Sequence, residues 1–150
     1  KEILKEQPND LILATHVCRG NNKSKSFLKD GAIATYEPIT ELFKLPYDVF
    51  FLEYDTDVEG SFEPLKEVPS DKAVVLGLYS TKFADLESYD FIKKRFNEAT
   101  KYIDPKNTAL SGQCGFSSTY EGNILTEENQ WIKLKHIVDT SRKIYDEISL

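Results

Sequence analysis

Four short apolar runs recur along this chain, and their pattern restricts the fold more than any other feature. They cover residues 11–17, 49–54, 73–79 and 108–114. Apolar and polar residues hardly alternate within them, which is typical of parallel strands covered on both faces. Helical patterns follow three of the four runs. The sequence therefore predicts an α/β protein with about four parallel strands and covering helices.

The predicted helices differ in length. The segment after the third run has apolar residues at helical spacing: Leu86, Tyr89, Ile92, Phe96, Ala99 and Ile103. Thr126 can cap a final helix, whose apolar stripe is expected at Trp131, Leu134, Val138, Ser141 and Tyr145. A short helix is predicted at 38–43, where Pro38 suits the first turn. Residues 55–69 contain a glycine and two prolines, and we predict a loop there.

Two architectures fit this alternation of strands and helices: an open doubly wound sheet and part of an eight-stranded barrel. A complete barrel takes about 250 residues, so four units would make half of one. A chain of 150 residues otherwise fits one domain. In both architectures the chemistry lies at the carboxyl ends of the strands.

Side chains that bind metals stand at the ends of three of these runs. His16 and Cys18 are two residues apart, so they share one face of an extended strand. Glu53 ends a run that is too apolar to hold a charge without a purpose. Cys114, the only other cysteine, ends the last run. One nitrogen, two sulfurs and a carboxylate oxygen are a zinc donor set, and the cysteines are expected to be reduced.

Each of these residues also has a purely structural interpretation. His16 could be a hydrogen-bonded core histidine, and either cysteine a small buried apolar residue. Glu53 could form an ion pair with Arg19 or Lys82 instead of binding a metal.

Several polar residues outside this set also have a predicted role. Lys82 could reach a substrate carboxylate or be an exposed loop lysine. Two residues beside Cys114 are expected to orient a ligand through hydrogen bonds: Ser111 and Gln113. Four others are expected to be solvated: Asp55, Asp57, Glu59 and His136.

Charge and hydropathy exclude two classes of partner. The net charge is −6 and no stripe of lysine and arginine appears, which argues against nucleic-acid binding. No run approaches the roughly 20 apolar residues that span a bilayer, so a cytoplasmic protein is expected. Residues 1–6 resemble the last turns of a helix, and the chain has no methionine. We therefore expect it to begin inside a longer protein.

Several segments together resemble the C-terminal catalytic barrel of cobalamin-independent methionine synthase, above all its short single-barrel bacterial relatives. The resemblance lies in residues 16–21, 50–55, 74–78, 113–116, 122–123 and 125–128. It implies that residues 1–150 form the C-terminal half of a (β/α)8 TIM barrel. It also implies that His16, Cys18, Glu53 and Cys114 bind the catalytic zinc, with Glu53, Cys18 and Cys114 in catalytic roles.

The activity that this resemblance implies is methyl transfer to a thiol. Homocysteine would be the acceptor, methionine the product and a 5-methyltetrahydrofolate polyglutamate the donor. Zinc suits this chemistry because it deprotonates a bound thiol and has no redox chemistry of its own. Glu53 is the ligand expected to yield when the substrate thiol arrives. In the family, residues that grip the substrates come largely from earlier strands, so this piece is expected to be incomplete alone.

Three other functions remain open at this stage. The chain could transfer an alkyl group to another thiol, such as coenzyme M, or from another donor. It could be a binding or structural module stabilised by a permanently closed zinc site, or a relative that has lost its metal. In every case an open four-stranded half-barrel leaves two sheet edges and an apolar face, so we expect self-association.

Overall fold

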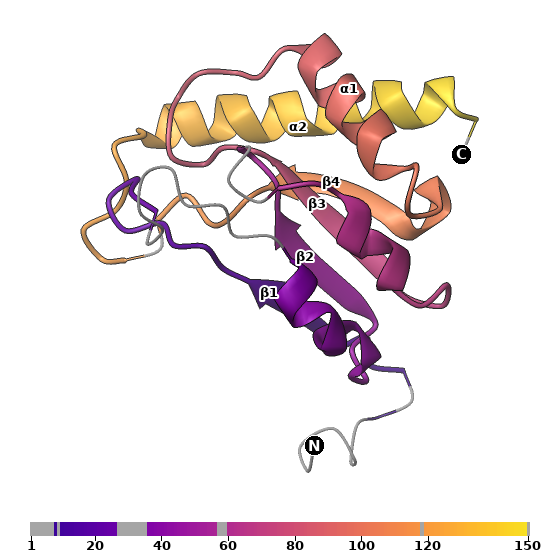
Figure 1. The fold of residues 1–150 in the computed structure, drawn as a ribbon. Coiled ribbons are helices and arrows are strands. Elements are labelled where there is room, and N and C mark those ends of the chain that lie inside the picture. Colours follow the sequence, from indigo (N-terminus) through magenta and orange to yellow (C-terminus); the bar gives the residue numbers. More distant parts are fainter. Residues whose placement is uncertain (1–7, 9, 27–35, 57–59, 118, 150) are drawn as a thin grey trace.

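The apolar runs form one parallel sheet in the computed structural model, which describes residues 8, 10–26, 36–56, 60–117 and 119–149. The strands are β1 (Ala14–Val17), β2 (Val49–Glu53), β3 (Ala73–Tyr79) and β4 (Thr108–Gly112). They lie side by side in the order β1-β2-β3-β4, and every neighbouring pair is parallel (Figure 1). The predicted α/β class and parallel sheet are confirmed.

Two α-helices begin at side-chain caps. In α1 (Tyr89–Ala99), the Ser88 hydroxyl accepts a hydrogen bond from the backbone N–H of Phe91. In α2 (Glu127–Glu147), Thr126 and Asn129 form a reciprocal capping box with two hydrogen bonds of 3.1 Å. The predicted cap at Thr126 is confirmed, because its hydroxyl satisfies one of the free N–H groups of the first turn.

Among the described residues, short 3-10 helices lie in the connections: η2 (Glu37–Lys44), η4 (Glu63–Glu67) and η5 (Pro105–Asn107). The first confirms the short helix predicted at 38–43. The second lies where we predicted a loop, and that prediction is wrong at this point. Pro64 lies in the first turn of η4 in a helical conformation, but a helix of 5 residues is too short to give a periodic apolar pattern.

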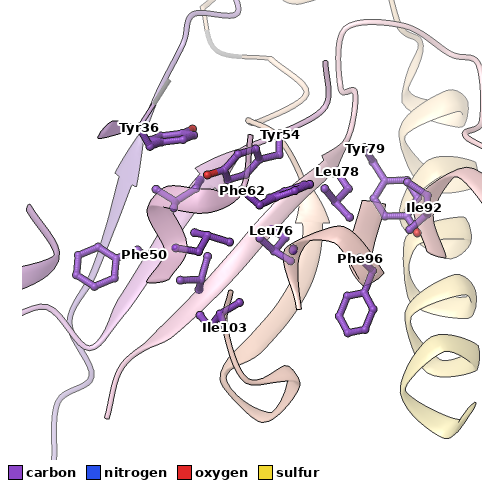
Figure 2. Close-up of a cluster of buried hydrophobic side chains, with 14 of the residues drawn as sticks. Tyr36, Phe50, Tyr54, Phe62, Leu76, Leu78, Tyr79, Ile92, Phe96 and Ile103 are labelled. Carbon is purple, nitrogen blue, oxygen red and sulfur yellow. The ribbon is translucent and has the colours of Figure 1, made fainter. Parts of the chain in front are cut away.

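The core lies on the face of the sheet that the helices cover. Alternate residues of β2 and β3, including Phe50 and Leu76, are buried with Ile92 and Phe96 of α1 (Figure 2). On the opposite face, Phe51 is 38% exposed and Ala109 is also exposed. The prediction that both faces are covered therefore holds for β3, which is buried from Val74 to Tyr79, but not for the exposed positions of β2 and β4. Sequential strand order with helices on one face is the pattern of a barrel, since a doubly wound sheet carries helices on both faces.

The buried face of α2 differs from the predicted one. Its buried residues are Lys133, Ile137, Thr140 and Ile144. Trp131 is 61% exposed and Val138 is 45% exposed, so the prediction was wrong for both. The reason is Lys133, which occupies a core position that the sequence pattern assigns to a polar face.

Two predictions fall partly outside the structure. The helical turns expected over residues 1–6 and the solvated side chains expected at Asp57 and Glu59 lie outside the described residues. Within the described part of the chain, no helix combines the length and the apolar character needed to cross a membrane.

Candidate metal centre

Four side chains from three strand ends meet at one edge of the sheet. His16 lies in β1 and Cys18 follows its end, Glu53 is the last residue of β2, and Cys114 follows β4. One ligand atom from each lies within 4.8 Å of all the others. The structure thus brings together all four predicted site residues, because parallel neighbours end at the same edge.

The distances within this cluster suit a tetrahedral ion. The sulfur atoms of Cys18 and Cys114 are 3.9 Å apart, and Nε2 of His16 is 3.3 Å from Oε1 of Glu53. Zinc bonds of their usual length at tetrahedral angles separate two sulfurs by about 3.8 Å, and a nitrogen from an oxygen by about 3.4 Å. The donor atoms therefore fit zinc without a large rearrangement.

Glu53 is a fully buried carboxylate held from two sides. Its Oε1 accepts the backbone N–H of Arg19 at 3.0 Å, whereas Oε2 is buried without a hydrogen-bond partner among the described residues. The Tyr36 hydroxyl fixes the backbone of Glu53, accepting from its N–H at 2.7 Å and donating to its carbonyl at 2.9 Å. A buried carboxylate oxygen without a donor is costly, and a bound cation would satisfy it.

His16 is oriented by the neighbouring strand. Its Nδ1 lies 3.2 Å from the carbonyl oxygen of Phe51 and donates to it in the tautomer that directs the other nitrogen to Glu53. The hydrogen bond to Glu53 raises the pKa of His16 from 6.5 to about 9, although burial acts in the opposite direction. Imidazole nitrogen and carboxylate oxygen thus face each other across a short gap, in a place that suits a metal cation.

Cys18 lies in the loop that continues from β1. The backbone N–H of Gly20 donates to its sulfur at 3.3 Å, and the φ of Gly20 is 95°, in the region that favours glycine. Burial raises the pKa of the Cys18 thiol, and the Gly20 N–H lowers it. A thiol whose pKa is raised is a weak nucleophile and ligand unless a cation removes its proton.

The residues around the cluster partly contradict the predictions. Among the described residues, Glu53 contacts the backbone N–H of Arg19 and the imidazole of His16. Lys82 is buried and pairs with Asp55 at 3.4 Å, so it is not an exposed loop lysine. The Asp55 side chain is fully buried, and desolvation raises its pKa against the opposing effect of Lys82. The prediction that Asp55 is solvated is therefore wrong.

The structure also differs from what we expected of His136, Ser111 and Gln113. His136 was predicted on the surface, but its Nε2 lies 2.7 Å from the carbonyl oxygen of Glu87 and its ring packs edge-on against Tyr79. Gln113 donates to Thr81, and Ser111 donates to the carbonyl of Gly112. Neither bond reaches a side chain of the cluster, so any effect of these two residues on a ligand is indirect.

The sequence patterns gave no sign of three residues that matter here. The Tyr36 hydroxyl accepts a hydrogen bond from the backbone N–H of Glu53. Thr81 accepts one from Asn21 in another loop of the site, and Lys133 of α2 donates one to Ser80 in the loop after β3. Their contacts join residues 17 to 60 positions apart, which no local periodicity records. The short spacing of Asn21 after Cys18 is the one signal that could have drawn attention to this network.

Fold and cluster define a class: an α/β protein of barrel type, with two thiols, an imidazole and a carboxylate gathered at the carboxyl ends of its strands. Residues 9–142 match the sequence model of the family described as cobalamin-independent synthase, catalytic domain. The chain belongs to this family, the cobalamin-independent methionine synthases, as the resemblance implied.

Known relatives and solved structures agree with this membership. The chain is 43% identical to the uncharacterized proteins YxjH and YxjG of Bacillus subtilis, over 93% and 96% of its length. It spans only 37% and 38% of those proteins. A Listeria monocytogenes structure, provisionally assigned as a vitamin-B12 independent methionine synthase, is 30% identical, with a TM-score of 0.65 over 95% of this chain and 38% of that one.

A second structure shows the fold alone. The B12-independent methionine synthase of Shewanella sp. W3-18-1, solved in complex with selenomethionine, is 18% identical. It matches with a TM-score of 0.72 over 93% of this chain and 40% of that one. The β1-β4 arrangement is therefore a recurring part of larger proteins.

Proposed function

We propose that this chain carries the zinc centre of a methyltransferase that moves a methyl group from a 5-methyltetrahydrofolate polyglutamate to homocysteine, giving methionine. The observation that carries the proposal is the convergence of His16, Cys18, Glu53 and Cys114 within 4.8 Å. Membership of the cobalamin-independent synthase family supports the reaction type. The two free thiols suit a reducing compartment, and we place the protein in the cytoplasm.

In this proposal the four clustered side chains hold the metal, and Cys18, Glu53 and Cys114 take part in its chemistry. Bound zinc would supply the Lewis acidity that keeps a substrate thiol in its nucleophilic thiolate form at neutral pH. Phe51 orients His16 through its carbonyl, and Gly20 supports the sulfur of Cys18. The Arg19 N–H gives Glu53 a partner within the fold, so this carboxylate is the one suited to yield its place to a substrate.

The remaining machinery is proposed to lie in the rest of the longer proteins. This chain spans less than two fifths of its curated relatives, and its sheet has an uncovered face next to the cluster. We therefore propose that residues 1–150 form the C-terminal half of the barrel. The residues that grip homocysteine and the folate would then come largely from the other half.

The test compares the two histidines of the chain. His16→Asn removes a donor and is expected to weaken zinc binding by more than about 100-fold, measured by competition with a chromophoric chelator. His136→Asn is the matched control and is expected to retain the wild-type affinity. Equal affinities in the two variants would place the metal elsewhere.

Chelation separates a catalytic zinc from a structural one. The expected result is that the chelator removes zinc and abolishes methionine formation from homocysteine and the methylated folate in the complete protein. Circular dichroism should show that the fold remains. Unfolding on metal removal would favour a structural module, and turnover with a different thiol or donor alone would redirect the substrate assignment.

A further inference from the structure

A single hydroxyl oxygen joins the two loops that carry the cysteines. Thr81, in the loop after β3, is fully buried and its Oγ1 accepts hydrogen bonds from two side-chain amides. Asn21 donates from 3.2 Å and Gln113 from 3.1 Å. Asn21 lies three residues after Cys18, and Gln113 directly precedes Cys114. Strand β3 adds no side chain to the cluster, yet its loop lies between both thiol-bearing loops.

Further hydrogen bonds connect the loops after β1, β3 and β4. The amide of Asn21 also donates to the carbonyl of Gly115 at 2.8 Å, beyond Cys114. The side-chain amide of Asn123 donates to the carbonyl of Thr81 at 3.3 Å. The backbone N–H of Gln113 donates to the backbone carbonyl of Tyr79 at 2.8 Å. The loops after β1, β3 and β4 thus form one network with Thr81 at its centre, and bonds made in a buried setting resist distortion.

The methyl group of Thr81 is closely packed as well. A Cβ placed on Gly112 would lie 2.6 Å from Cγ2 of Thr81, closer than two carbon atoms can approach. Gly112 is the last residue of β4 and lies two residues before Cys114. Thr81 therefore packs closely against the backbone that leads into the second cysteine.

We propose that Thr81 is a positioning residue of the metal centre: its hydroxyl fixes the spacing of the Cys18 and Cys114 sulfurs and thereby the affinity for the ion. This inference rests on the proposed zinc centre. His16 and Glu53 do not need Thr81, because they lie on the paired strands β1 and β2 and Tyr36 holds the latter. Loss of the Thr81 hydroxyl should therefore affect the two thiols selectively.

The experiment measures metal binding rather than turnover. Thr81→Val keeps the shape of the side chain but removes the acceptor for Asn21 and Gln113. We expect its zinc affinity to fall by on the order of 10- to 100-fold in chelator competition, as for other residues that orient metal ligands. With Co²⁺ in place of zinc, the sulfur-to-metal charge-transfer band should weaken, which a general loss of stability would not cause in folded protein.

Two further variants make the test specific. Thr81→Ser keeps the hydroxyl and should bind zinc nearly as the wild type does. Thr140→Val is the matched control, because Thr140 is a buried threonine of α2 whose side chain lies beside the Tyr79 hydroxyl and not beside Thr81, Asn21 or Gln113. It should alter stability without altering the affinity or the Co²⁺ spectrum.

The outcomes distinguish a failure of this inference from a failure of the proposed function on which it rests. If the wild-type protein binds no zinc at His16 and its neighbours, the proposed function itself fails. If the wild type binds zinc and Thr81→Val binds it equally well with an unchanged Co²⁺ spectrum, the role of Thr81 is overturned. Should Thr81→Val fail to fold, Asn21→Ala and Gln113→Ala each remove one donor, and a wild-type affinity in both would overturn it as well.

Discussion

The backbone at Gly77 of β3 passes so close to its neighbours that a methyl group has no room. A Cβ there would lie 2.7 Å from the Cα of Gln113 and 3.0 Å from the carbonyl oxygen of Leu52. Both are backbone atoms, so no change of rotamer relieves the clash. We expect Gly77→Ala to lower the free energy of unfolding by about 1–3 kcal/mol in urea titrations. It should also weaken zinc binding, because Gln113 adjoins Cys114.

Gly115 provides the control for this prediction. It follows Cys114 directly, but a Cβ there meets nothing within 4 Å. Gly115→Ala should leave both the urea midpoint and the zinc affinity close to the wild-type values. A similar loss in the two variants would show that any side chain near Cys114 disturbs the site, whatever its contacts.

At the residue scale, sequence reasoning identified the cluster itself but not its supports. His16, Cys18, Glu53 and Cys114 are of types that bind metals, and each stands near the end of an apolar run. Both features can be read locally. Thr81 is an ordinary loop threonine whose importance arises from a contact with Gln113, 32 positions away. Side chains of this kind are recognisable only after the strands are paired.

Helix α2 is fastened to the loop after β3 by a buried lysine. Nζ of Lys133 donates to the carbonyl of Ser80 at 2.7 Å and pairs with the carboxylate of Glu87 at 3.3 Å. The Lys133 side chain is fully buried and that of Glu87 is only 16% exposed. Lys133→Ala leaves Glu87 and the Ser80 carbonyl without this partner, so we expect a loss of about 3 kcal/mol in the free energy of unfolding. Denaturant titration followed by circular dichroism measures it.

Lys135 is the matched control on the same helix. It pairs with Asp139, but both side chains are more than half exposed. An exposed pair of this kind contributes about 0.5 kcal/mol or less, so Lys135→Ala should shift the denaturation midpoint very little. Equal shifts in the two variants would contradict the role given to the buried pair.

At the element scale, the predicted bounds were most accurate for the strand that is buried along most of its length. The apolar run of β3 has the predicted bounds, 73–79, because this central strand is buried along nearly its whole length. The first run was predicted to begin at residue 11, but β1 begins at Ala14, and Ile12 is 72% exposed. Apolar composition alone does not show where strand pairing stops. The face of α2 was misjudged because a lysine was assumed to be solvated.

The whole molecule presents a sheet with an uncovered side. Strands β1 and β4 are the two edges of the described sheet, and Phe51 and Ala109 are exposed on the face away from the helices. Free edges and exposed apolar faces favour pairing with another copy. We expect the isolated 150-residue chain to self-associate, which light scattering at several concentrations measures as a mass above 17.2 kDa.

A charge placed on the uncovered face should weaken that association. Ala109→Glu introduces one there, and Asn97→Glu introduces the same charge at an exposed position of helix α1 as the control. The first variant should shift the chain toward the monomer, whereas the second should behave as the wild type does. A wild-type chain that stays monomeric at all concentrations would rule out this role for the face.

The order of the strands has a consequence for how the molecule responds to its surroundings. Cys18 and Cys114 are 96 positions apart and lie in the loops that follow the two outermost strands of the described sheet. An ion that binds the folded arrangement of these side chains and is released on unfolding adds its binding free energy to the stability of the fold. The melting temperature should then rise with the logarithm of the free zinc concentration, and it would report how much zinc is available to the protein.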